Sequence, residues 1–317
     1  MTNKTKKLFA SISFVLVLSF VLGMVSLVLK PKSNTKDAGF YHPSAYSICN
    51  EPKNTIDVLF LGTSQAYCSF VPLEIWKNLG ITSYLCSTPS QPLYYTEEFL
   101  CKAFETQSPS LVILETDAVF EKFDEIDIIN HELGNRFSLI KYHSRWKELT
   151  AKDFTFNYDY SQRHQGKGFV YDLRQTENVY TEYMTPTNEV KVVANTSMYY
   201  LDRIVRFCEE KNVKLVLVSS LSVANWDFSK HNAIAEIAKK YNVEYLDTNL
   251  YLNEIELDWE KDWLDEGKHL NYYGALKFTN WFQQHLIGFG DFTDKRNNPD
   301  YSFWDTDASE IELEITD

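Results

Sequence analysis

Apolar residues in the first half of the chain gather in short continuous runs, separated by amphipathic segments. The runs are TIDVLFLG (55–62), ITSYLC (81–86) and SLVILET (110–116). Runs of this length are typical of strands buried on both faces of a sheet. Residues 72–80 and 94–107 lie between them and have helical spacing, the first with Pro near its start and Gly at its end. The pattern predicts strands that alternate with helices.

The alternation continues in the second half of the chain. Helical spacing over 189–212 leads into the β-branched run VKLVLVSS (213–220). A helix over 229–242, a short strand over 243–249 and a last helix over 274–286 follow. Parallel strands need crossover connections, which helices usually supply. We therefore expect an α/β fold with a doubly wound, mainly parallel sheet.

Three regions depart from this pattern. Residues 119–188 are rich in Tyr, Phe, His and Asn and predict an inserted helical and loop segment, either a lid over the sheet or extra packing. Residues 33–54 are polar and predict a linker. Residues 291–317 form an acidic C-terminal tail that we expect to be solvated, with an added edge strand as the alternative.

The N-terminal segment is the most apolar part of the chain. Residues 8–29 contain no charge, and lysines flank them on both sides. A helix of this length spans about 33 Å, enough to cross a bilayer core of about 30 Å. A cleaved signal peptide is the alternative, but it usually has a shorter apolar region and a small-residue cleavage site, which we do not find. We expect residues 1–32 to be an uncleaved single-pass anchor with a cytoplasmic N-terminus.

Charge separates this anchor from the rest of the protein. The formal net charge is −13, yet residues 1–32 contain five lysines and no acid, which leaves residues 33–317 with 26 basic and 44 acidic residues. The acidic charge of residues 33–317 argues against nucleic-acid binding, and it makes a neutral glycan a more suitable substrate than an anionic polymer. The five cysteines show no CxxC spacing and predict no disulfide framework, which suits a bacterial surface protein.

Candidate chemistry lies directly after the first strand and after the last one. The turn Gly62-Thr63-Ser64 follows the first strand and offers Ser64 as a nucleophile, although such turns also serve as helix caps. The loop before the final helix contains Asp265 and His269. A carboxylate beside an imidazole fixes its tautomer and leaves the other nitrogen free to accept a serine proton. Together these residues supply an acyl-transfer triad.

These two motifs resemble the SGNH/GDSL-type hydrolases. Gly62-Thr63-Ser64 matches their nucleophile turn, and residues 265–275 match their last block, Asp-x-x-His followed by an apolar residue, Asn and Gly-Ala. Here the spacing from Asp265 to His269 is one residue longer, so Glu266 is an alternative carboxylate. The resemblance covers roughly residues 55–290. It implies a flavodoxin-like three-layer α/β/α fold in which Ser64, His269 and Asp265 are catalytic.

The middle blocks of that family are not matched. The family supplies a Gly after the second strand and an Asn after the third as oxyanion donors, and neither is present. The backbone N–H of Ser64, with Ser90 or Gln91, is the expected replacement. No phosphate-binding loop, HExxH sequence or paired Cys/His set occurs, so we expect no metal and no cofactor. The acidic cluster Asp124, Asp127, His131 and Glu132 is interpreted as exposed helix residues.

An N-terminal anchor combined with divergent blocks is similar to one membrane-anchored subgroup of this family. The subgroup includes the teichoic-acid D-alanine transfer protein and the alginate O-acetylation proteins. The resemblance implies an extracytoplasmic serine esterase or O-acyltransferase that acts on acyl groups of a cell-envelope polysaccharide. Expected partners are a cell-surface glycan or acyl donor and a multi-span membrane O-acyltransferase. The alternative is a catalytically inactive, membrane-anchored glycan-binding or scaffolding subunit.

Overall fold

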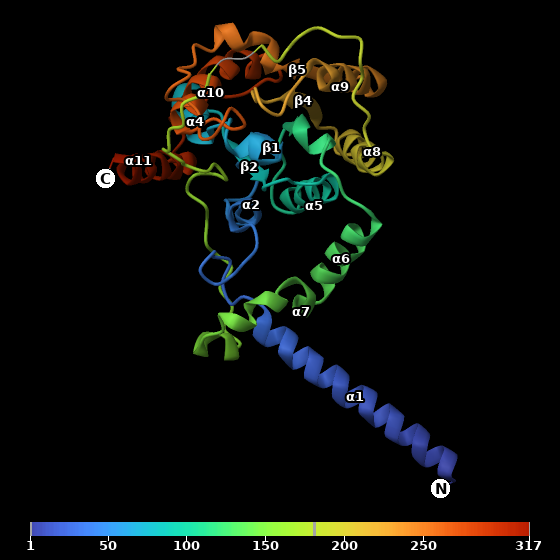
Figure 1. Ribbon diagram of the computed structural model, residues 1–317. Helices are drawn as coiled ribbons and strands as arrows, with labels where there is room; N and C mark the ends of the chain where they lie inside the picture. Colours follow the sequence, from blue (N-terminus) through green and yellow to red (C-terminus); the bar gives the residue numbers. More distant parts are fainter. Residues whose placement is uncertain (1, 180–181, 317) are drawn as a thin grey trace. The chain divides into compact units, whose positions relative to one another are not determined.

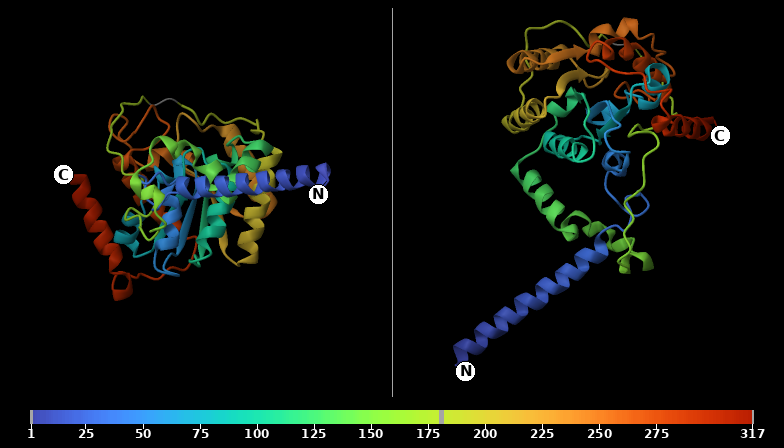
Figure 2. Two further views of the ribbon diagram at one scale, coloured as in Figure 1. Left: turned by 90° about the horizontal axis from the view of Figure 1, so that it is seen from below. Right: turned by 180° about the vertical axis from the view of Figure 1, so that it is seen from behind.

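The computed structural model describes residues 2–179 and 182–316 and divides the chain into two compact units (Figures 1 and 2). The first unit contains Met1–Pro43 and Phe123–Gln162, and the second contains Ser44–Lys122 and Arg163–Asp317. The predicted insertion over 119–188 is thus divided between the two units.

The second unit is built on a five-stranded sheet. Its strands are β1 (Val58–Gly62), β2 (Ser83–Ser87), β3 (Leu111–Glu115), β4 (Lys214–Ser219) and β5 (Glu244–Asp247). All neighbours pair in parallel, in the order β2-β1-β3-β4-β5. This confirms the doubly wound α/β fold. From β1 the sheet is extended first to one side, by β2, and then to the other, by β3, β4 and β5. Ligands of such sheets bind beyond the carboxyl ends of the strands at this switch point between β1 and β3.

Helices cover the sheet, which explains why its strands are apolar throughout. Every residue of β1, β2 and β3 is buried. Figure 1 shows α4 and α10 on one side of the sheet and α5 and α8 on the other. Phe60 of β1 stacks on Phe70 at a centroid distance of 4.5 Å, and Phe70 contacts Phe278 and Phe282. The larger helices of this unit are α4 (Pro72–Leu79), α5 (Leu93–Ala103), α8 (Asn195–Glu210), α9 (Phe228–Tyr241), α10 (Tyr272–Leu286) and α11 (Phe303–Thr316).

Short helical turns connect these elements. They are α2 (Pro43–Tyr46), η1 (Ser47–Asn50), α3 (Ser64–Tyr67), η2 (Thr116–Val119), η5 (Thr248–Glu254) and η6 (Pro299–Tyr301). The first two lie within the predicted linker 33–54, where Ala45, Ile48 and Glu51 are buried. The later part of that stretch therefore packs as part of the second unit and is more than a spacer.

The C-terminal region differs from the expected solvated tail. Residues 303–316 form α11, in which Trp304, Ala308 and Ile311 are buried while most of the acidic residues are exposed. Trp304 lies 5.5 Å from Trp76 of α4, measured between ring centroids. The spacing of the three buried residues is that of one helix face, so the acidic sequence belongs to an amphipathic helix.

The first unit contains the N-terminal helix α1 (Asn3–Leu29) and four short elements. These are α6 (Glu125–Arg136), α7 (Ser138–Lys141), η3 (His143–Lys147) and η4 (Ala151–Phe154). By length and apolar composition α1 can cross a membrane, and nearly all of its apolar window is exposed. A helix that is apolar all round and unburied is unlike the core helix of a water-soluble protein.

The predicted acidic cluster lies at the start of α6 and has a structural role. Asp124 and Asp127 form a reciprocal capping box, in which each carboxylate accepts a backbone N–H from the other residue. Across the described residues no group of three or more His, Cys, Asp or Glu side chains is placed to hold a metal ion.

Candidate active site

Ser64 lies where β1 ends and α3 begins. The Thr63 side chain caps this turn, because its Oγ accepts a hydrogen bond from the Gln65 N–H at 3.2 Å. Ser64 is the first residue of α3. This is the carboxyl edge of the sheet at the switch point between β1 and β3, where a ligand site is expected in this topology.

Gly62 and Glu115, which ends the neighbouring strand β3, fix the conformation of that turn. Gly62 has φ 152°, and a Cβ at this position would lie 2.6 Å from the Cβ of Glu115, so only glycine fits. The Glu115 Oε2 atom accepts hydrogen bonds from the Thr63 N–H at 3.4 Å and the Thr63 hydroxyl at 3.2 Å. Burial, and then the charge of Asp117, raise the pKa of Glu115 to about 8. Glu115 is therefore a positioning residue for the turn that carries Ser64.

His269 bridges Ser64 and Asp265. Its Nε2 lies 2.8 Å from the Ser64 Oγ, and its Nδ1 lies 2.7 Å from the Asp265 Oδ2. The other Asp265 oxygen accepts the backbone N–H groups of His269 at 2.8 Å and Lys268 at 3.0 Å. Because an ionised Asp265 only accepts hydrogen bonds, the imidazole donates from Nδ1, and Nε2 is then available to take a proton from Ser64.

Gln65 ties the two halves of this arrangement together. Its Nε2 donates to the Lys268 carbonyl at 2.9 Å, and the Ser222 hydroxyl donates to the same carbonyl at 2.8 Å. The carbonyl belongs to the residue before His269, while Gln65 is the residue after Ser64. Through Ser222 the link also includes the segment after β4. The sequence did not reveal it, because Gln65 looks there like an ordinary turn residue.

The histidine loop is also fixed at its far end. Asn271 caps α10, since its side-chain oxygen accepts the Gly274 N–H at 3.1 Å. The Asn271 amide donates to the carbonyl oxygens of Lys261 at 2.6 Å and Arg174 at 2.9 Å. These bonds hold the stretch from 261 to 271 as a closed loop, so His269 is presented by a rigid support.

The remaining sequence candidates have other contacts. Glu266 is exposed, and among the described residues it makes no contact with His269, whose carboxylate partner is Asp265. The buried Gln91 amide donates to the Cys86 carbonyl and the Thr96 hydroxyl. Ser90 has φ 45°, and its side chain lies near the Glu121 carboxylate. A role of Ser90 or Gln91 in an oxyanion hole stays a prediction, and the Gln91 amide is already engaged by Cys86 and Thr96.

Tyr67 lies at the other end of α3, and the sequence analysis did not single it out. Its phenol lies near the Ser64 side chain, which lowers the pKa of Tyr67 against the larger effect of burial. Burial raises the pKa of Tyr67 to about 12, so the phenol remains a neutral donor at physiological pH. Side chains three positions apart on a helix lie on the same face. The spacing of Ser64 and Tyr67 is the only sequence signal that pointed to this contact.

One part of the predicted insertion runs along the histidine loop. The Tyr272 N–H donates to the Asp172 carbonyl at 2.9 Å, and the Thr176 N–H donates to the Trp263 carbonyl at 2.9 Å. Arg174 lies between them, mostly exposed, and pairs with the Asp172 carboxylate at 2.6 Å. Residues 172–176 thus run beside the two ends of the histidine loop.

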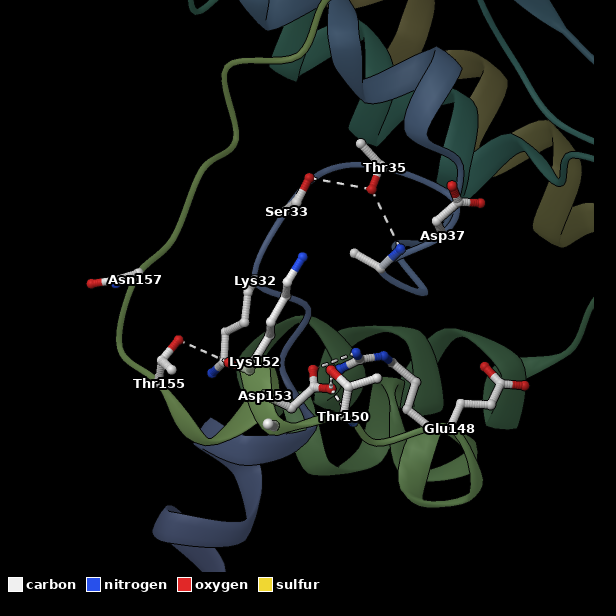
Figure 3. A pocket seen from close by; sticks show the side chains of 13 residues that line it. Lys32, Ser33, Thr35, Asp37, Glu148, Thr150, Lys152, Asp153, Thr155 and Asn157 are labelled. Atoms are coloured by element: carbon white, nitrogen blue, oxygen red, sulfur yellow. Dashed lines mark hydrogen bonds and ion pairs between the residues drawn. The ribbon is translucent and has the colours of Figure 1, made fainter.

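A separate hollow of about 890 Å³ lies in the first unit (Figure 3). Residues of two stretches, 32–38 and 145–157, line it. Lys32, Arg145 and Lys152 are balanced there by Asp37, Glu148 and Asp153, and Arg145 pairs with Asp153 at 2.7 Å. With no net charge and no triad residue in its lining, this hollow indicates no ligand class.

Comparisons with known proteins give loose structural similarities. No family model and no curated protein matches the sequence. A Bacteroides fragilis protein provisionally assigned as an acylhydrolase is 14% identical, with 77% of this chain and 94% of that chain covered and a TM-score of 0.37. A Parabacteroides merdae protein provisionally assigned as a GDSL-like lipase is 11% identical, with 76% and 99% covered and a TM-score of 0.39. A GDSL-like lipase from Bacteroides thetaiotaomicron is 12% identical, with 73% and 88% covered and a TM-score of 0.34.

Proposed function

We propose that this protein is a serine esterase or O-acyltransferase of the SGNH/GDSL type. The observation that carries the proposal is the chain of contacts from the Ser64 Oγ to His269 at 2.8 Å and from His269 to Asp265 at 2.7 Å. A hydroxyl, an imidazole and a carboxylate in this order form the arrangement used for acyl transfer on several unrelated folds. It sits at the sheet edge where ligands of doubly wound sheets bind.

In the proposed reaction, Ser64 attacks the carbonyl carbon of an ester while His269 Nε2 accepts the hydroxyl proton. Asp265 stabilises the imidazolium that forms. Collapse of the tetrahedral intermediate breaks the bond to the leaving oxygen, which takes the proton from His269. Water or an acceptor hydroxyl then gives its proton to His269 and attacks the acyl-serine. The bond between the acyl carbon and the Ser64 Oγ breaks, the Oγ takes the proton back from His269, and an acid or a new ester leaves.

The proposed oxyanion donors are the Ser64 backbone N–H and the Tyr67 phenol. Tyr67 contacts the Ser64 side chain and retains its proton at neutral pH, as the raised pKa of about 12 indicates. In the proposed role, the neutral phenol donates to the carbonyl oxygen of the bound ester and stabilises the negative charge that develops on that oxygen. This assignment replaces the Gly and Asn donors, which the sequence lacks.

The proposed setting is the outer face of a cell membrane, with α1 as a single-pass anchor and residues 33–317 exported. The support is the 27-residue apolar helix and the acidic composition of the rest of the chain. From this setting we propose a cell-envelope polysaccharide as the source or acceptor of the acyl group, and a multi-span membrane O-acyltransferase as the partner. The acidic charge favours a neutral glycan.

The experiment uses the full chain in mild detergent with two readouts. Turnover of an aryl acetate is compared with that of Ser64→Ala, and a fluorophosphonate probe reports whether Ser64 is nucleophilic without needing the natural donor. We expect the probe to label the wild-type chain and not Ser64→Ala. A wild-type chain that neither labels nor turns over the ester would reject the enzyme and favour the inactive scaffolding or glycan-binding subunit.

A further inference from the structure

A segment of the first unit folds around the end of the proposed membrane helix. Within residues 136–156, which we term the juxtamembrane segment, the Leu139 N–H donates to the Ser26 hydroxyl at 3.1 Å. The Arg145 guanidinium donates to the Leu29 carbonyl at 2.5 Å. Ser26 and Leu29 lie in the last turn of α1, within about 5 Å of its end. The segment is thus fixed at the level where α1 would leave the bilayer.

Internal contacts make this segment a defined structure. Arg145 is buried and pairs with the buried Asp153 at 2.7 Å. Asp153 in turn accepts the Thr150 N–H at 2.8 Å as part of a capping box. Side chains on its surface therefore have fixed positions relative to α1.

Large aromatic side chains point out of the segment and are not covered by protein. Trp146 and Phe154 are each 65% exposed, and Phe156 is 67% exposed. Phe137, between α6 and α7, is 55% exposed. Single exposed apolar residues are ordinary, but a group of four aromatics on one short segment marks a surface that contacts something other than water.

The charge of the segment is opposite to that of its surroundings. Arg145 and Asp153 neutralise each other, which leaves Arg136, Lys141, Lys147 and Lys152 against Glu148 alone. The exported part as a whole has 26 basic and 44 acidic residues. The Lys147 Nζ lies 5.6 Å from the centre of the Trp146 ring. Aromatic rings beside lysines are typical of side chains at a membrane interface.

We propose that the juxtamembrane segment is a second membrane contact, lying in the headgroup layer of an anionic outer leaflet. Trp146, Phe154 and Phe156 enter the boundary between headgroups and acyl chains, and the lysines meet lipid phosphates. The proposal rests on α1 spanning the membrane. It does not depend on the chemistry of Ser64.

The test uses the full chain in lipid nanodiscs that contain phosphatidylglycerol and brominated phosphatidylcholine. Brominated lipid quenches tryptophans that enter the bilayer. We expect a quenched fraction of the emission in the wild-type chain, and its loss in Trp146→Phe. The matched control adds Ile126→Trp to that variant, because this exposed position lies about 15 Å along α6 from Arg136, and we expect much weaker quenching there.

Charge is tested by omitting phosphatidylglycerol and, separately, by changing Lys141, Lys147 and Lys152 to Glu. Both changes are expected to reduce quenching of Trp146 at least twofold. Co-elution of the chain with the discs reports the anchor independently. A chain that fails to enter the discs overturns both the anchor and this contact. A chain that enters the discs with Trp146 unquenched overturns this contact alone.

Discussion

Aromatic residues differ between the core of the second unit and the juxtamembrane segment of the first. In the second unit Phe60, Phe70 and Phe282 are fully buried and pack against one another between the sheet and its helices. In the juxtamembrane segment Trp146 and Phe154 are mostly exposed, although the neighbouring Arg145 is buried and bonds the Leu29 carbonyl. Burial of the first set stabilises the fold in water. The second set has no such role, which is why we propose that it contacts lipid.

Polar groups differ between the units in one respect. At the edge of the sheet in the second unit, a hydroxyl, an imidazole and a carboxylate meet. Both units pair buried charges, Arg145 with Asp153 in the first and Lys167 with Glu51 and Asp307 in the second, so the difference lies in the triad. In the two proposals above, chemistry resides in the second unit and membrane contact in the first.

Ser64→Ala should have the largest effect on turnover. If it did not, the catalytic role given to the second unit would be wrong. We expect a loss of turnover of roughly 10⁵-fold or more, since a triad without its nucleophile retains only background catalysis. Hydrolysis of an aryl acetate measures it. Ser309→Ala, an exposed serine of α11, is the matched control and should turn over at the wild-type rate. Equal rates in wild type and Ser64→Ala would place the chemistry elsewhere.

Asp265→Asn should reduce kcat by roughly 10³–10⁴-fold, because the amide cannot hold the imidazole tautomer or stabilise its protonated form. Glu266→Gln is the matched control, since Glu266 is exposed and Asp265 is the residue bonded to His269. Steady-state kinetics distinguish the two carboxylates. A larger loss in Glu266→Gln than in Asp265→Asn would reverse their assignment.

Phe70→Ala and Phe154→Ala compare the two kinds of aromatic residue directly. We expect Phe70→Ala to lower the free energy of unfolding by about 3–5 kcal/mol, because it opens a cavity under β1. Phe154→Ala should change it by no more than about 0.5 kcal/mol in detergent, since it removes an exposed side chain. Urea unfolding measures both, and similar losses would contradict the distinction between the units.

Tyr67→Phe should lower kcat by roughly 10- to 100-fold with little change in KM, as expected for a donor used mainly in the transition state. The substitution keeps the ring and removes only the hydroxyl that contacts Ser64. Unchanged kcat would remove Tyr67 from the oxyanion site. An increase confined to KM would assign it to substrate binding.

Glu115→Gln should alter the pH dependence of stability. Between pH 4.5 and about 8 the folded chain retains a proton on Glu115 that the unfolded chain has released. Raising the pH through this window therefore lowers the free energy of unfolding, by at most about 1.4 kcal/mol per pH unit. The variant should lose this slope. Equal pH dependence in the wild type and in Glu115→Gln would show that Glu115 is ionised in the folded chain over this window.

Much of the α/β unit was predictable from the sequence because its signals are local. Apolar runs in the sequence predicted all five strands, and the structure confirms that they are parallel. The placement of Ser64, Asp265 and His269 at strand ends was also predicted, and the structure brings the three side chains together. Their catalytic role remains a prediction until activity is measured.

The contacts that position the site were not predictable, because they join residues far apart in sequence. Glu115 supports the Ser64 turn from a neighbouring strand, and Gln65 reaches a carbonyl more than 200 residues away. The sequence analysis also expected one insertion over 119–188. Its first part folds with α1, and this pairing depends on bonds such as Arg145 to Leu29 that no periodicity reveals.

The division of the chain has a consequence for how a protease would separate α1 from the rest of the protein. The polypeptide passes between the units three times, after Pro43, after Lys122 and after Gln162. A single cut near Pro43 would break the covalent link from residues 1–43 to the remainder of the chain. Residues 123–162 would stay joined to the second unit, and contacts such as that of Arg145 with the Leu29 carbonyl would still hold them to α1. Release of the second unit therefore depends on non-covalent contacts within the first unit as well as on cleavage.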